Sequence, residues 1–121
     1  MATNLTITLT EDRPGAFAAV AGALGDAGVN IDGVTEVGGT VHLLVEEAAR
    51  ARQVLEAAGH AVAAEREVLV LSLPDRPGEL ARITHSLATA GVNLTFVYLA
   101  TNTRIVLGVD DLATARQALG A

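Results

Sequence analysis

Asp12-Arg13-Pro14-Gly15 recurs as Asp75-Arg76-Pro77-Gly78, and this repeated tetrapeptide determines how the 121-residue chain is interpreted. Gly28-Val29-Asn30 returns as Gly91-Val92-Asn93 at the same offset. A repeat of fixed period indicates the duplication of one structural unit, here of about 60 residues. The chain is therefore expected to contain two copies of one unit, each presenting the same polar turn.

The residues around the first turn predict that it joins a strand to a helix. Apolar residues alternate with threonines over 5–10, which is the period of a strand with one buried face. Apolar residues then recur at helical spacing over 17–27, and Gly28 ends this helix. Pro14 is expected at the first helical position, where its missing N–H group costs nothing.

Four more elements complete the first unit, which is predicted to span residues 1–67. They are two strands over 30–38 and 40–46 joined at Gly38-Gly39, a helix over 46–58 and a strand over 60–67. The resulting β-α-β-β-α-β order folds as an antiparallel sheet with both helices on one face, the ferredoxin-like arrangement.

The second unit, predicted over residues 68–121, repeats this order without its last strand. Its elements are a strand over 68–73, a helix ending at Gly91, strands over 94–101 and 104–109, and a helix capped by Asp110 or Asp111. An unpaired apolar edge at 68–73 promotes aggregation. We therefore predict that another segment covers it, from this chain or from a second one.

The composition excludes several classes of partner. The net charge is −6, no lysine is present and only 2% of residues are aromatic. Nucleic-acid binding is not expected, because the basic footprint and the stacking platforms are both missing. A membrane partner is not expected either, because anionic lipid would repel the chain and no apolar run approaches the ~20 residues of a spanning helix. Without a signal-peptide pattern, the expected location is cytoplasmic.

No constellation for catalysis is visible. Cysteine is absent, and His42, His60 and His85 are scattered without a second ligand at helical spacing, so no metal site is expected. Phosphate-binding and nucleophile motifs are also missing. The chain is therefore predicted not to be an enzyme and to need no cofactor.

The repeated turn carries the most suggestive chemistry. The unpaired N–H groups at a helix N-terminus favour an anion such as a carboxylate, and Gly15 and Gly78 leave that backbone open. Asp12 and Asp75 offer a charge for an ammonium group. Together these features describe a site for a free amino acid. The structural alternative is that each aspartate bonds a nearby turn N–H group, and for the motif alone this alternative is favoured.

Other polar residues near the predicted strands are weaker candidates. Asn30 and Asn93 each open a second strand, where an amide can both donate to and accept from a ligand, or simply satisfy its own turn. Phe96 and Tyr98 share one face of a strand that is apolar on both faces, which predicts burial on both. The Tyr98 hydroxyl needs a polar partner.

The tetrapeptide, the apolar helix and the following Ala-Gly-Val-Asn-Ile or Ala-Gly-Val-Asn-Leu resemble the ACT domain, in two copies along the chain. The whole is similar to small stand-alone proteins of two tandem ACT domains. The resemblance implies a non-catalytic regulator, expected as a homodimer, that binds a free amino acid at an interface between ACT units. The candidate ligand-binding residues are Asp12, Arg13, Pro14, Gly15, Ala16, Asn30, Ile31, Asp75, Arg76, Pro77, Gly78, Glu79, Leu80, Asn93, Leu94 and Tyr98.

The sequence departs from this pattern in the tetrapeptide and in the missing last strand of the second unit. Serine-binding members of the family contact the ligand with an asparagine two residues before the proline, and here that residue is Asp12 or Asp75. The copies also differ, since Ala16 corresponds to Glu79, whose charge lies where a ligand carboxylate is expected. We therefore expect unequal sites. The alternative function is a ligand-free assembly module that pairs subunits or docks on a metabolic enzyme, with its turns filled by side chains.

Overall fold

The computed structural model describes residues 2–121 and divides the chain into two compact units, Met1–Glu67 and Val68–Ala121. The elements of the first unit are β1 (Thr3–Thr8), α1 (Ala16–Asp26), β2 (Gly33–Val37), β3 (Thr40–Leu44), α2 (Ala48–Ala57) and β4 (Val62–Glu67). Those of the second unit are β5 (Leu69–Ser72), α3 (Glu79–Thr89), β6 (Leu94–Ala100), β7 (Arg104–Val109) and α4 (Leu112–Leu119). The predicted α+β fold of two ferredoxin-like units, the second without its last strand, is confirmed.

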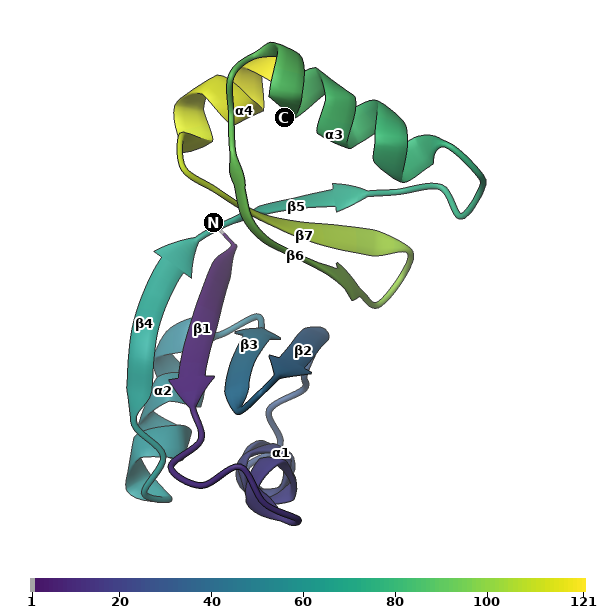
Figure 1. Cartoon of the computed structure of the whole chain (residues 1–121). Coiled ribbons are helices and arrows are strands. Elements are labelled where there is room, and N and C mark those ends of the chain that lie inside the picture. The colour runs from purple at the N-terminus through teal and green to yellow at the C-terminus, as the bar shows by residue number, and fades with distance from the viewer. Residues whose placement is uncertain (1) are drawn as a thin grey trace. The chain divides into compact units, whose positions relative to one another are not determined.

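The first unit is an antiparallel sheet with two helices on one face. Its strand order is β4-β1-β3-β2, and α1 and α2 lie on the same side of it (Figure 1). The alternation predicted for β1 is observed, because Leu5 and Ile7 are fully buried beneath the helices and belong to one core with Leu24 and Leu55. This core holds the end of β1 and the start of α1 in place, and with them the turn between them.

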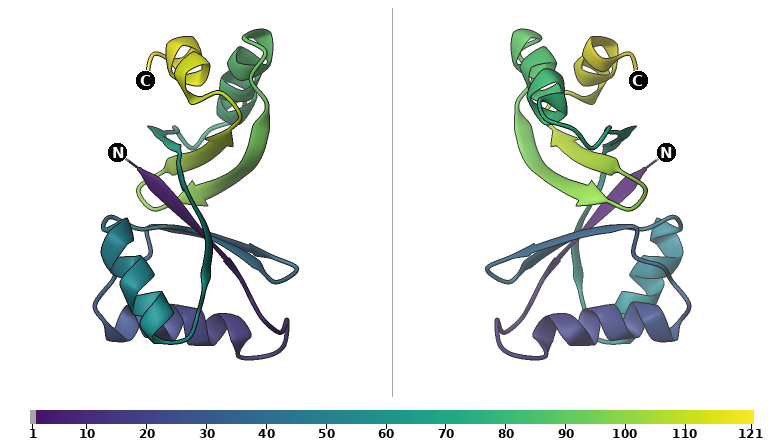
Figure 2. Two further views of the ribbon diagram at one scale, coloured as in Figure 1. Left: turned by 90° about the vertical axis from the view of Figure 1, so that its left-hand side faces the viewer. Right: turned by 90° about the vertical axis from the view of Figure 1, so that its right-hand side faces the viewer.

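The second unit repeats the arrangement with three strands in the order β6-β7-β5. The side views of Figure 2 show α3 and α4 on one face of these strands. Central strand β7 contributes Ile105 and Leu107 to a separate core that also contains Ile83 and Leu87 of α3. Asp111 caps α4, because its Oδ1 accepts a hydrogen bond from the Thr114 N–H group at 3.1 Å.

Several predicted element boundaries are wrong. Strand β2 begins at Gly33 rather than at residue 30, because the Asn30 side chain donates to Asp32 Oδ1 at 2.8 Å and forms a local turn there. Helix α2 begins at Ala48, with Glu47 at its N-cap. Pro14 is not the first helical residue, because Gly15 forms the N-cap of α1. The proline instead precedes the cap.

Two predictions about strand burial have different outcomes. Within the described second unit, β5 pairs with β7 and no further strand of that unit lies beyond it, so the second unit does not itself supply the predicted cover. Cover by a second chain stays a prediction. Burial on both faces of β6 is wrong: Tyr98 is 5% exposed, but Leu99 on the opposite face is 68% exposed and borders an open cavity.

The described residues show neither a membrane-crossing helix nor a metal cluster. None of the helices is long and apolar enough to cross a bilayer. Within residues 2–121, no group of three or more histidine or acidic side chains is placed to hold a metal ion.

Candidate functional site

The two repeated turns have the same backbone conformation. Gly15 and Gly78 both lie in the left-handed region, at φ 88° and ψ −12° and at φ 89° and ψ −11°. Only glycine adopts this conformation without a steric penalty from Cβ. The repeated tetrapeptide therefore encodes one structure twice, in which a glycine cap turns the chain into a helix.

Each turn is also tied to the hairpin of its own unit. The Leu9 N–H group donates to the Gly39 carbonyl at 2.7 Å, and the Leu73 N–H group donates to the Thr103 carbonyl at the same distance. The strand end before each turn is thereby fixed against a β-hairpin. This places the hairpin beside the turn.

The first turn borders an open cavity of about 470 Å³. Its walls come from the end of β1, the turn itself, the first residues of α1 and the loop that carries His60. Arg13, Gly15 and Ala16 line it, and the side chain of Ala16 is too small to fill the helix start. The N–H groups of Phe17 and Ala18 have no hydrogen-bond partner among residues 2–121. The space and the free donors together fit a small anionic group.

The charged side chains of this turn are accessible. Arg13 Nε lies 2.7 Å from Glu11 Oε2, and both side chains are 68% exposed. Such a surface ion pair contributes about 0–1 kcal/mol, so a ligand carboxylate can displace Glu11 from Arg13 at little cost. Asp12 is exposed and forms no hydrogen bond or ion pair with another described residue. The structural alternative, in which this aspartate bonds a turn N–H group, is not observed.

The second turn borders a cavity of about 320 Å³ with a more apolar lining. Leu73, Leu80 and Leu99 contribute much of its wall. Asp75 lines its rim, is exposed and has no polar partner among residues 2–121. Arg104, from the adjacent hairpin, also borders the cavity and donates through Nε to the Thr101 carbonyl at 2.8 Å.

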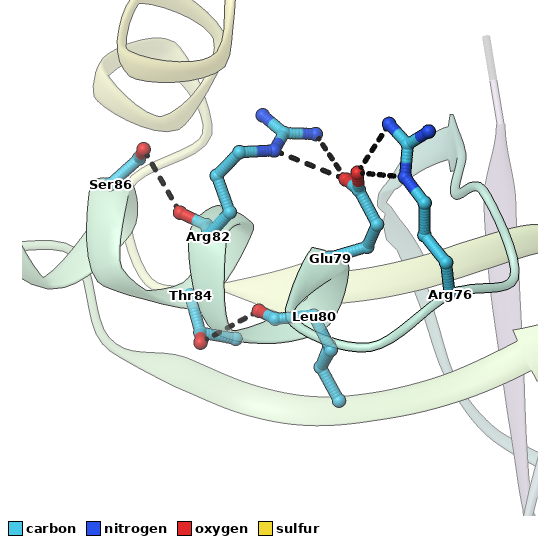
Figure 3. A network of polar contacts seen from close by, with 6 residues as sticks. All are labelled: Arg76, Glu79, Leu80, Arg82, Thr84 and Ser86. Carbon is cyan, nitrogen blue, oxygen red and sulfur yellow. Dashed lines mark hydrogen bonds and ion pairs between the residues drawn. The ribbon is translucent and has the colours of Figure 1, made fainter.

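Glu79 distinguishes the second turn from the first. Its residue is 8% exposed, and each carboxylate oxygen is held by one arginine (Figure 3). Arg76 Nε and Nη2 both lie 2.8 Å from Oε1, whereas Arg82 Nε and Nη2 lie 3.1 and 2.9 Å from Oε2. The hydrogen bonds from Arg76 and then Arg82 lower the pKa of Glu79, against the opposing effect of its burial. The carboxylate is therefore charged at neutral pH and is held by one arginine of the preceding turn and one of its own helix.

The two asparagines lie away from the turns of their own units. Asn30 lines a small cavity of about 120 Å³ with Glu46, Glu47 and Arg50, beyond the C-terminal end of α1, whereas the turn precedes its N-terminal end. In the second unit, the Asn93 N–H group donates to Asp110 Oδ1 at 2.9 Å. Neither asparagine shares a cavity with the tetrapeptide of its own unit.

Other candidate residues pack in the core or shape a turn, and they do not line the cavity of their own turn. Ile31 and Leu94 are half-buried and pack against the cores of their units. Tyr98 is buried outside the three cavities, stacks on Phe96 with ring centroids 6.0 Å apart, and has its pKa raised by burial. Pro77 and Gly78 shape the second turn but do not line its cavity.

Several cavity residues were not anticipated from the sequence, among them His60 and Arg104. His60 reaches the first cavity because β4 pairs with β1, with Val62 opposite Ile7. Arg104 reaches the second cavity because it is the first residue of β7, next to the hairpin whose Thr103 carbonyl accepts a hydrogen bond from the Leu73 N–H group. Neither residue has a local sequence signal for this role, since each is brought to its turn by strand pairing.

Comparisons with known proteins bear on the fold that carries these turns. The sequence model of the ACT domain matches residues 3–57, which is most of the first unit. No curated protein sequence matches the chain. Among solved structures, a protein from Bacteroides thetaiotaomicron is similar with a TM-score of 0.81 and 25% identity, over 98% of this chain and 86% of that one.

Two further similar structures show the same fold. The ligand-free regulatory subunit of aspartate kinase from Thermus thermophilus has a TM-score of 0.73 and 21% identity, over 98% of this chain and 88% of that one. The corresponding subunit from Thermus flavus has a TM-score of 0.70 and 19% identity, over 98% and 90%. The first unit, with the glycine-capped turn between β1 and α1, therefore matches the ACT domain family over residues 3–57.

Proposed function

We propose that this chain is a non-catalytic regulatory protein that binds a small free amino acid at the turn of its first unit. In this proposal the N–H groups at the start of α1 and the Arg13 guanidinium receive the ligand carboxylate. Asp12, which is exposed, has no polar partner among residues 2–121 and adjoins the cavity without lining it, receives the ammonium group. The two ends of a zwitterion are thereby matched by groups only a few residues apart along the chain.

The observation that carries the proposal is the open state of the first turn. A ligand-free assembly module would have its turn filled by its own side chains. The first turn instead borders about 470 Å³ of space, with two N–H donors unpaired among the described residues. A cavity of this volume lies within the range of small-molecule sites in proteins.

The likeness to known proteins supports the regulatory part of the proposal. The ACT family match covers the first turn, and two similar structures are named as regulatory subunits of aspartate kinase. We further propose that a second ACT unit completes the site, as the family resemblance implies, and that the regulated partner is a metabolic enzyme. The cytoplasmic location stays a prediction.

The test is a thermal-shift screen of the twenty amino acids, followed by calorimetric titration of any that raise the unfolding midpoint. At least one amino acid is expected to bind, because a ligand of the folded state alone must stabilise it. Arg13→Ala is expected to weaken that binding about tenfold or more, since a hydrogen bond to a charged group contributes about 1.5–3 kcal/mol.

Arg52→Ala is the matched control, because Arg52 is an arginine of the same unit that pairs with Glu56 and Glu65 away from the cavity. It should leave the affinity unchanged. Flat titrations with folded wild-type protein, for every amino acid, would contradict the proposed function.

A further inference from the structure

We infer that Glu79 is a built-in carboxylate ligand of Arg76, so that the arginine of the second turn is already occupied and only the arginine of the first turn is open to a free amino acid. The first part of this inference stands on the geometry of the second unit. The second part, which concerns stoichiometry, rests on the proposed function.

The two turns differ in the side chains that decide this point. Arg13 and Arg76 occupy equivalent places in the tetrapeptide, but Ala16 replaces Glu79 at the first residue of the helix. Ala19, one turn further along α1, stands where α3 has Arg82. The first unit therefore has the arginine that can receive a carboxylate but no internal carboxylate to occupy it.

The geometry of Glu79 is that of a bound ligand. Its side chain is 10% exposed although its two arginine partners are 68% and 63% exposed, so the guanidinium groups close over it. The carboxylate is tethered three residues from each arginine, which gives it a high effective concentration at their guanidinium groups. An external carboxylate must displace this tethered group from Arg76, whereas at the first turn it displaces only the exposed Glu11.

Glu79→Ala tests the geometric part with acetate as the probe. The substitution removes the internal carboxylate and leaves two guanidinium groups beside the emptied position. Acetate is then expected to raise the unfolding midpoint of Glu79→Ala in a saturable manner, compared with sodium chloride at equal ionic strength. Wild type, with the position filled, should show no such difference between acetate and chloride.

Two controls separate site filling from general salt effects. Glu79→Gln keeps a side chain of the same shape in the position and should not respond to acetate. Glu47→Ala removes an exposed carboxylate that precedes α2 and makes no capping hydrogen bond, and it should also not respond. An equal response in all variants, or none in Glu79→Ala, overturns the inference. If Glu79→Ala is unfolded in chloride, the same comparison is made by its recovery of helical circular dichroism in acetate.

Titration with the amino acid found in the screen tests the stoichiometric part. Wild type should bind one equivalent per chain, and the double variant A16E/A19R, which transplants the ion-paired trio onto α1, should lose that binding. G22E/G25R is its matched control, because it places the same two charges three residues apart on exposed positions of α1 that do not line the cavity, and it should retain the binding. Two equivalents per wild-type chain, or full binding by A16E/A19R, contradicts the inference while leaving the proposed function intact. If acetate stabilises Glu79→Ala but no amino acid binds the wild type, the geometric part of the inference is supported and the proposed function is contradicted.

Discussion

At the scale of single residues, His42 is the histidine with the clearest physical constraint. It lies on β3, where its Nδ1 is 3.2 Å from Thr6 Oγ1 and 3.4 Å from Asn4 Nδ2. The Thr6 hydroxyl already accepts a hydrogen bond from the Asn4 amide at 3.0 Å, so it is free to donate to an unprotonated Nδ1. Burial lowers the pKa of His42. Both effects favour the neutral imidazole in the folded chain.

This lowered pKa predicts a loss of stability on mild acidification. The unfolded chain binds a proton at His42 near pH 6.5, before the folded chain does, so this stabilisation is present above that pH and is lost as pH falls through the folded pKa. Denaturant unfolding between pH 7.5 and 5.5 should show the decline. His42→Gln should make this decline in stability smaller, whereas substitution of the exposed His85 by Gln should leave the decline unchanged. Equal pH profiles for wild type and His42→Gln would refute the assignment.

Replacing either of two glycines by alanine is expected to change the free energy of unfolding, in opposite directions. A Cβ on buried Gly108 would lie 2.5 Å from the Phe96 ring, whereas a Cβ on Gly22 of α1 would have nothing within 4 Å. Gly108→Ala is therefore expected to cost about 1–3 kcal/mol by overpacking. Gly22→Ala should stabilise by about 0.5–1 kcal/mol, since glycine weakens a helix interior. Equilibrium denaturation of the two variants measures both values, and a shared sign would contradict this account.

At the scale of elements, sequence periodicity predicted the order of strands and helices correctly. Alternation marked β1, helical spacing marked α1 and α3, and Gly38-Gly39 marked a hairpin whose two glycines have φ of 55° and 89°. Element ends were predicted less well, because they depend on individual hydrogen bonds. The Asn30–Asp32 contact that delays β2 is one such bond, and no periodic pattern encodes it.

The candidate site was predictable only where it is local in sequence. The tetrapeptide turn and the unequal charge at Ala16 and Glu79 could be inferred from the chain, whereas the glycine N-cap was not, because Pro14 was expected at the first helical position. The two-arginine clamp was missed, although Arg76 and Arg82 stand three residues on either side of Glu79, the spacing of helical neighbours. His60 could not be inferred, because its position beside the first turn depends on how β4 pairs with β1.

At the scale of the whole molecule, the outer edge of β5 predicts self-association. Within residues 2–121 this strand pairs with β7 alone, and its Leu69-Val70-Leu71 sequence is apolar. Unpaired apolar edges recruit other strands unless a charge, a proline or a bulge protects them. The described part of β5 contains none of these devices. We therefore propose that two copies of the chain pair through β5.

Sedimentation equilibrium tests this proposal against a monomer mass of 12.4 kDa. Wild type is expected near twice that mass. Ser72→Lys should shift the equilibrium toward monomer, because Ser72 is exposed at the end of β5 and a lysine on an edge strand opposes its pairing with another strand. Thr40→Lys, on a strand already paired on both sides within its unit, is the control and should remain dimeric. A wild-type monomer at all concentrations rules out the dimer, whereas a dimer insensitive to Ser72→Lys places the interface elsewhere.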